Sequence, residues 1–120
     1  MKVAFTTSGD DLSAHLDSRF GRAPAFLILD LDTQSMEVVP NQQNLKAVQG
    51  AGIQAAQTLI QAGVTAVVTG HCGPKAHRVL RAAKVSIHHC AAATVQDALT
   101  AYQANALPAA TAPNAEGHWS

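Results

Sequence analysis

The sequence of 120 residues has few aromatic side chains, two cysteines and no long apolar run. Three phenylalanines, one tyrosine and one tryptophan are too few for the stacking platforms that bind single-stranded nucleic acid. Cys72 and Cys90 can form at most one bridge, so we expect them to be thiols or metal ligands in a reducing compartment. No apolar stretch approaches the roughly 20 residues of a membrane helix, and no signal-peptide pattern is present. These absences predict a cytoplasmic protein that binds neither nucleic acid nor membrane.

Acidic residues are missing from the middle of the chain, between Glu37 and Asp97, although the formal net charge is zero. The same stretch holds cations and histidines in quantity: Lys46, Lys75, Arg78, Arg81, Lys84, His71, His77, His88 and His89. A run of this kind is usually a solvated basic face. Because several of these cations flank glycine-bearing turns, the distribution also favours a site that attracts an anion.

Hydrophobic residues make up 48% of the chain and charged residues 13%, which is typical of a folded domain. We expect a single domain over residues 1–106 and a mobile C-terminal tail over residues 107–120. Alternating and helical apolar patterns predict strands at residues 2–7, 25–31, 36–39, 65–69 and 84–88, and helices at about 45–62, 74–83 and from 95 onward. Strands that alternate with helices predict an α/β fold: a five-stranded mixed sheet flanked by three helices, with one antiparallel hairpin.

Ligands of α/β proteins gather outside the carboxyl ends of parallel strands. In this sequence those ends are residues 7–9, 70–73 and 88–90. If the two later strands are parallel neighbours, four side chains meet at one edge although 16 residues lie between the pairs: His71, Cys72, His89 and Cys90.

Three chemistries compete for this edge. A zinc or copper site would suit Cys and His, but no C-x-x-C or H-x-x-x-H spacing is present. A cysteine phosphatase would use the H-C-x₅-R sequence from His71 to Arg78, with Cys72 as nucleophile. Pro74 has no N–H for a phosphate, however, and Lys75 stands where that loop normally needs glycine. A non-covalent seat for a polyanion needs only the helix N-terminus, the glycine turn and the cations.

Three segments, in this order, resemble one known family. They are Arg-Phe-Gly-Arg-Ala-Pro-Ala-Phe at residues 19–26, Gly-Ala-Gly at 50–52 and Val-Val-Thr-Gly-His-Cys-Gly-Pro at 67–74. Together they are similar to the dinitrogenase iron–molybdenum cofactor biosynthesis family over roughly residues 1–107. The resemblance implies a ribonuclease-H-like sheet without ribonuclease activity. It also implies a molybdenum–copper sulfide cluster held without a covalent link to the chain.

Carried over residue by residue, the resemblance places the cofactor-binding groups in three loops: Arg19, Phe20, Gly21 and Arg22; Asn44 and Lys46; and Gly70, His71, Cys72, Gly73 and Pro74. His71 and Cys72 are the candidates for direct contact with metal. The resulting hypothesis is a non-enzymatic protein that stores, delivers or assembles an anionic metal–sulfide cluster, with a protein partner in delivery. Two alternatives stay open, a phosphatase that uses Cys72 and Arg78 and a non-catalytic interaction domain.

Overall fold

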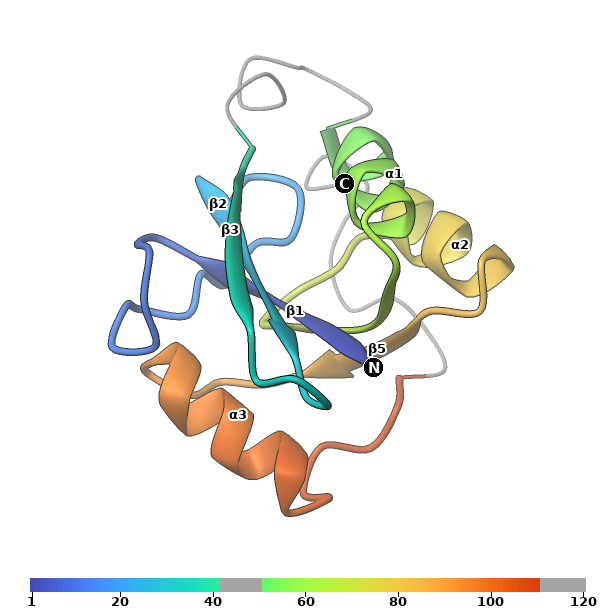
Figure 1. The fold of residues 1–120 in the computed structure, drawn as a ribbon. Helices are drawn as coiled ribbons and strands as arrows, with labels where there is room; N and C mark the ends of the chain where they lie inside the picture. Colours follow the sequence, from blue (N-terminus) through green and yellow to red (C-terminus); the bar gives the residue numbers. More distant parts are fainter. Residues whose placement is uncertain (42–50, 111–120) are drawn as a thin grey trace.

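The computed structural model describes residues 1–41 and 51–110. Within these ranges the chain forms five strands and three helices (Figure 1): β1 (Lys2–Thr7), β2 (Ala25–Asp30), β3 (Met36–Pro40), α1 (Ala51–Gln61), β4 (Val64–Thr69), α2 (Pro74–Ala82), β5 (Ser86–His89) and α3 (Val95–Gln103). The strands form one sheet in the order β3-β2-β1-β4-β5. The predicted five-stranded mixed sheet with three helices is confirmed.

Strand direction decides where a site can form. β1, β4 and β5 are parallel to one another, whereas β2 is antiparallel to both β1 and β3. The predicted hairpin is therefore β2 and β3, and it lies at one side of the sheet. Because β1, β4 and β5 run in the same direction, their carboxyl ends share one edge.

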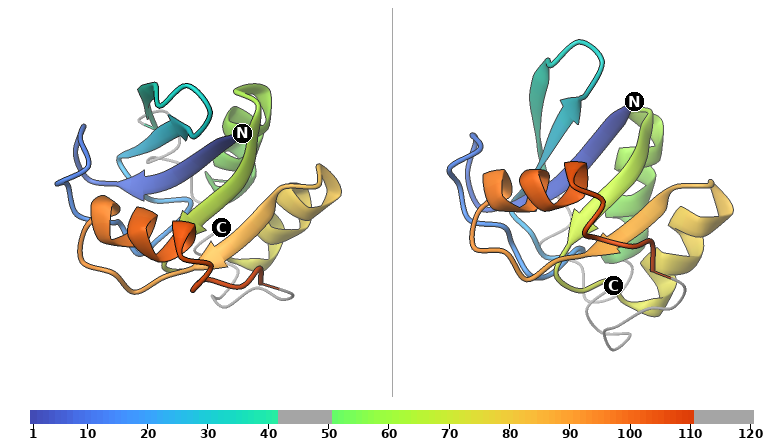
Figure 2. Two further views of the ribbon diagram at one scale, coloured as in Figure 1. Left: turned by 60° about the horizontal axis from the view of Figure 1, so that its bottom comes forward. Right: turned by 90° about the horizontal axis from the view of Figure 1, so that it is seen from below.

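The two faces of the sheet are covered by different helices, with α1 and α2 on one face and α3 on the other (Figure 2). Successive side chains of a strand point to opposite faces. In β4, accordingly, Val67 packs in the cluster beneath α1 and α2, while Ala66 and Val68 pack toward α3. The central strands are buried on both faces, which explains their nearly continuous apolar sequence.

Local signals set the ends of several elements as the sequence predicted. Gly63 follows α1 with a φ of +84°, and Pro74 is the first residue of α2. The Thr94 side chain accepts a hydrogen bond from the Asp97 N–H at the start of α3. The start of the fifth strand was predicted wrongly. Lys84 has a φ of +63° and ends the turn after α2, so β5 begins at Ser86.

Residues 107–110 lie beside β5. The Ala110 N–H donates to the Ile87 carbonyl over 2.6 Å, and His88 Nδ1 donates to the Leu107 carbonyl over 2.7 Å. The first part of the predicted tail thus pairs with the outer strand of the sheet. Mobility of residues 111–120 stays a prediction, because they lie outside the described residues, as does the predicted start of the first helix at residues 45–50. In the described ranges, no helix combines the length and apolarity needed to span a membrane.

Candidate functional site

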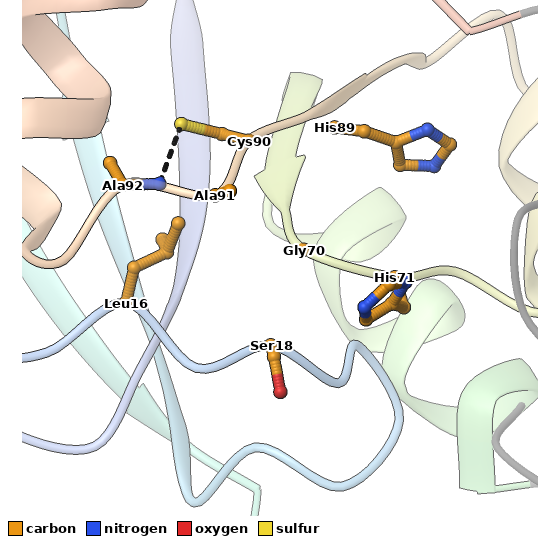
Figure 3. A pocket seen from close by; sticks show the side chains of 8 residues that line it. All are labelled: Leu16, Ser18, Gly70, His71, His89, Cys90, Ala91 and Ala92. Atoms are coloured by element: carbon orange, nitrogen blue, oxygen red, sulfur yellow. Dashed lines mark hydrogen bonds between the residues drawn. The ribbon is translucent and has the colours of Figure 1, made fainter.

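A cavity of about 440 Å³ opens at the edge that β1, β4 and β5 share (Figure 3). Its volume lies within the roughly 300–1,000 Å³ of typical ligand pockets. The lining residues come from the loop after β1, the turn after β4 and the end of β5: Leu16, Ser18, Gly70, His71, His89, Cys90, Ala91 and Ala92. Three segments distant in the sequence therefore form one concave surface.

Close contact between two backbone segments builds one wall of this cavity. A Cβ atom on Gly70 would lie 2.8 Å from Ser18 Cα and 2.9 Å from the Ser18 carbonyl oxygen. Next to this contact, the Phe20 N–H donates to the His71 carbonyl over 3.0 Å. Only glycine fits such an approach. The predicted loop at residues 19–22 and the predicted turn at residues 70–74 thus meet.

Two buried threonines stabilise this edge of the sheet through hydrogen bonds. The sequence analysis predicted neither of them. Thr6 Oγ1 donates to the Asp17 carbonyl over 2.6 Å and lies 3.1 Å from Thr69 Oγ1. The Thr69 carbonyl in turn accepts from the Cys90 N–H over 2.9 Å. A polar residue at the end of each apolar strand could have indicated them. A buried hydroxyl needs a hydrogen-bond partner, so such a residue suggests a contact with another segment.

The loop after β1 is also attached to the segment that precedes α3. The Leu16 N–H donates to the Ala93 carbonyl over 3.1 Å, and the Val95 N–H donates to the Ala14 carbonyl over 3.0 Å. These bonds give hydrogen-bond partners to backbone groups that lie outside the sheet. The long connection that the sequence left without periodic structure is thereby held across the end of the sheet.

The two cysteines lie in different environments. Cys72 is completely buried in the core cluster beneath α1 and α2, and this burial raises the pKa of its thiol to about 12. Cys90 lines the cavity, and its Sγ accepts a hydrogen bond from the Ala92 N–H over 3.4 Å (Figure 3). Cys72 is therefore a neutral thiol at neutral pH, and of the two it is Cys90 that faces the cavity.

Histidines concentrate near the same edge. His71 and His89 line the cavity, and burial together with positive charge on His71, His77 and His88 lowers the pKa of His89. His77 lies on α2, where burial and then the charge of Arg81 lower the pKa of its ring. His88 points to the other face of the sheet, with its ring 5.1 Å from the Tyr102 ring. The lowered pKa values favour the neutral form of the His77 and His89 rings.

Several other predicted residues support the site from outside the cavity. Phe20 is buried with its ring 5.6 Å from that of Phe26, so it packs the core. The Arg19 side chain is 49% exposed, with Nε 4.0 Å from Asp17 Oδ1. Gly21 is buried and Arg22 is partly exposed in the same loop.

Four predicted site residues remain: Gly73, Pro74, Asn44 and Lys46. Gly73 and Pro74 begin α2, and neither lines the cavity. Asn44 and Lys46 lie outside the described residues, so the third predicted loop is not placed. Asn41, the last described residue before them, contacts the chain just after the first loop, because its Nδ2 donates to the Ala23 carbonyl over 2.9 Å.

The side-chain donor groups that line the cavity are imidazole, thiol and hydroxyl groups. Among the described residues, no lysine, arginine, aspartate or glutamate lines it. Nor do residues 1–41 and 51–110 bring three His, Cys, Asp or Glu side chains together in a way that could hold a metal ion. A cage made of protein ligands alone is therefore absent from the described part of the chain. The cavity suits a ligand that brings most of its own donor atoms.

The fold and this edge define a small α/β domain with a ligand cavity at the carboxyl ends of its parallel strands. The model of the family described as dinitrogenase iron-molybdenum cofactor matches residues 1–105. The chain belongs to this family, as its sequence predicted. Membership supports a role in binding or handling a metal cluster.

Solved structures agree with the assignment. The apo form of the orange protein from Desulfovibrio gigas is 36% identical, with a TM-score of 0.92 over 95% of this chain and 96% of that one. A NifB-like protein of the DUF35 family from Thermotoga is 33% identical, with a TM-score of 0.84 over 97% and 98% of the two chains. An uncharacterized protein of Methanocaldococcus jannaschii is 24% identical over 102 residues, which is 82% of each chain.

Proposed function

We propose that this protein binds and carries an anionic metal–sulfide cluster in the cavity at the carboxyl edge of the sheet, without a covalent link. The main observation in support of this proposal is the cavity of about 440 Å³, which is built from three strand ends and lined by imidazole, thiol and small apolar groups. Family membership and the likeness to the orange protein support a cluster as the ligand.

The chemistry of the walls supports this choice of ligand. Sulfide atoms at the surface of a cluster accept hydrogen bonds from imidazole and main-chain N–H groups, and such bonds to an anion are stronger than neutral ones. Leu16, Ala91 and Ala92 supply apolar walls that keep water from the cluster. Because the cluster carries its own sulfide ligands, it does not need the three-ligand cage that a single metal ion needs.

The identity of the metals is the finer part of the proposal. We place molybdenum and copper in the cluster by resemblance to the orange protein. Neutral imidazole and thiol groups are suitable neighbours for copper, a soft metal when monovalent. In this proposal His71 and Cys90 face the cluster. Cys72 acts through the turn that it anchors in the core, and the loop at residues 19–22 lies beside that turn. Asn44 and Lys46 stay candidate cofactor-binding residues.

The proposed activity is to carry a cluster and not to catalyse a reaction. We place the protein in the cytoplasm, where the reducing conditions keep cysteines as free thiols. Storage, delivery to a protein partner and assembly all require a cluster that is held non-covalently and can be released. The phosphatase alternative needs Cys72 as a thiolate. A buried thiol with a pKa of about 12 is protonated at neutral pH, which argues against that reaction.

The experiment is reconstitution of anaerobically purified protein with tetrathiomolybdate and copper(I), followed by visible absorption and elemental analysis. Charge transfer from sulfide to metal colours a cluster protein, so a visible band and bound molybdenum that survive gel filtration are expected. A colourless protein without bound metal would instead favour the interaction domain.

A matched pair of variants locates the cluster. Ala91→Asp puts a carboxylate into the cavity wall, and Ala82→Asp puts the same charge at the exposed end of α2. We expect the first variant to retain at least about tenfold less cluster and the second to behave like the unaltered protein, because an unpaired negative charge repels an anion. Equal retention by both variants would contradict the cavity as the binding site.

A further inference from the structure

Two histidines lie on α2 and at the end of β5, and one of them, His89, also lines the cavity. His77 is the fourth residue of α2 and directly follows Ala76, which packs in the core cluster with Ile87 of β5. His89 lies two residues after Ile87, so its side chain points to the same face of the sheet, toward α2. Because α2 packs against β5, both imidazoles belong to the face of the sheet that α2 covers.

Both side chains have a buried ring nitrogen that makes no hydrogen bond to a described residue. His77 is only 8% exposed. Its Nε2 atom and the Nε2 atom of His89 are both buried, and neither has a hydrogen-bond partner among the described residues. A buried polar atom without a protein partner is destabilising, so such an atom calls for a ligand, an ion or a water molecule.

The electrostatics of the two rings act in the same direction. Burial lowers the pKa of both His77 and His89, and positive charge on His71, His77 and His88 lowers the pKa of His89 further. Two neutral imidazoles with free lone pairs are metal ligands, whereas two protonated ones would repel a cation. The surroundings therefore keep both rings in the form that binds metal.

We propose that His77 and His89 form a two-imidazole site for a single borderline divalent metal ion of the zinc type, at the side of the proposed cluster cavity that His89 also lines. Two protein ligands leave open positions on a tetrahedral ion, and the cavity next to His89 has room for water to fill them. No group of three suitable side chains exists among the described residues, which is why water must complete the coordination. This inference does not rest on the proposed function, because it needs no cluster.

The test is calorimetric titration of the cluster-free full chain with zinc chloride at neutral pH. We expect one zinc ion per chain, with a dissociation constant below about 100 μM. His77→Ala and His89→Ala should each weaken binding at least about tenfold, since each removes one of two protein ligands. His15→Ala, which removes an exposed histidine of the loop after β1, should leave the affinity unchanged.

A measurement on the unaltered protein keeps the proposal testable if a variant fails to fold. In nitrogen-15 spectra of the imidazoles, zinc should shift the Nε2 resonances of His77 and His89 and leave those of His15 in place. Failure to bind zinc, equal affinity of the three variants or shifts confined to other histidines would each overturn the proposal. The cluster experiment can succeed or fail independently, because no molybdenum or sulfide is present in this titration.

Discussion

Strands β4 and β5 are neighbours, and a histidine–cysteine pair stands near the carboxyl end of each, yet the two pairs have different environments. After β4, Cys72 enters the core and only His71 reaches the cavity. At the end of β5, both His89 and Cys90 line the cavity. His89 is in register with Thr69, so the pair after β4 lies two residues further along its strand than the pair of β5. The same two residue types thus give a structural thiol in one case and a cavity thiol in the other.

The path of the chain after each strand explains the difference. After β4, α2 begins at Pro74 and covers the face shared with α1, so the turn must direct Cys72 inward. After β5, the chain crosses the end of the sheet to reach α3 on the opposite face (Figure 2), and Cys90 lines the cavity. The direction of the next helix therefore decides which thiol lines the cavity.

The largest expected difference is in thiol reactivity. With a pKa of about 12, about one Cys72 in 10,000 is a thiolate at pH 8, about a thousandfold less than at the ordinary value of 9.0. In iodoacetamide labelling followed by mass spectrometry, Cys90→Ser protein should therefore react far more slowly than Cys72→Ala protein. The slow rate should rise about tenfold per pH unit below the pKa of Cys72 while the protein stays folded. Similar labelling rates for the two variants would contradict the conclusion that Cys72 is buried while Cys90 lines the cavity.

The second prediction concerns the backbone contact that only the β4 turn makes. Gly70→Ala places a Cβ 2.8 Å from Ser18 Cα, and backbone atoms must move to relieve the clash. We expect a loss of about 1–3 kcal/mol in the free energy of unfolding, measured with urea. Ala91→Gly on the exposed chain after β5 is the control and should cost less than about 1 kcal/mol. If both variants are equally stable, the approach of loop and turn is not a constraint.

A third prediction tests the fastening behind the β4 turn. Thr6→Val removes the donor to the Asp17 carbonyl and leaves Thr69 Oγ1 without that neighbour. Losing a buried hydrogen bond should cost about 1–2 kcal/mol in urea unfolding. The matched variant is Thr65→Val, which removes an exposed hydroxyl from β4 and should change stability by less than about 0.5 kcal/mol. A larger effect at residue 65 would show that the buried pair does not hold this edge.

The smallest expected effect lies after β5, where α3 starts with a side-chain cap and α2 has none. Thr94→Ala removes the acceptor of the Asp97 N–H, and we expect a loss of about 1 kcal/mol. Thr94→Ser keeps the hydroxyl and should recover most of that stability. Thermal unfolding followed by circular dichroism measures both changes, and failure of the serine variant to recover would assign the effect to packing.

Much of the fold could be predicted from the sequence, because its signals are local. Alternating apolar residues gave β1 and β2, Gly63 and Pro74 gave helix ends, and Thr94 gave a cap. The start of β5 could not be predicted in this way. Lys84 takes a left-handed conformation that glycine usually takes, and no apolar pattern reports the φ of a lysine.

The site was predictable only in outline. Strand order and direction imply that His71, His89 and Cys90 share an edge, and they line one cavity. The contributions of Ser18, Leu16 and the Thr6–Thr69 pair were missed, since these residues carry no chemistry that singles them out in a sequence. They matter because of the contacts that close the cavity.

The sequence by itself determined which elements form, which family the chain belongs to and that histidines and thiols gather at the ends of parallel strands. It could do so because residue periodicity, glycine, proline and capping act over a few neighbouring residues. Only the tertiary structure decided that Cys72 is buried, that Cys90 faces the cavity and that His77 and His89 share one side of the sheet. Burial and solvent access depend on the elements packed around a side chain, and those elements lie far away in the sequence.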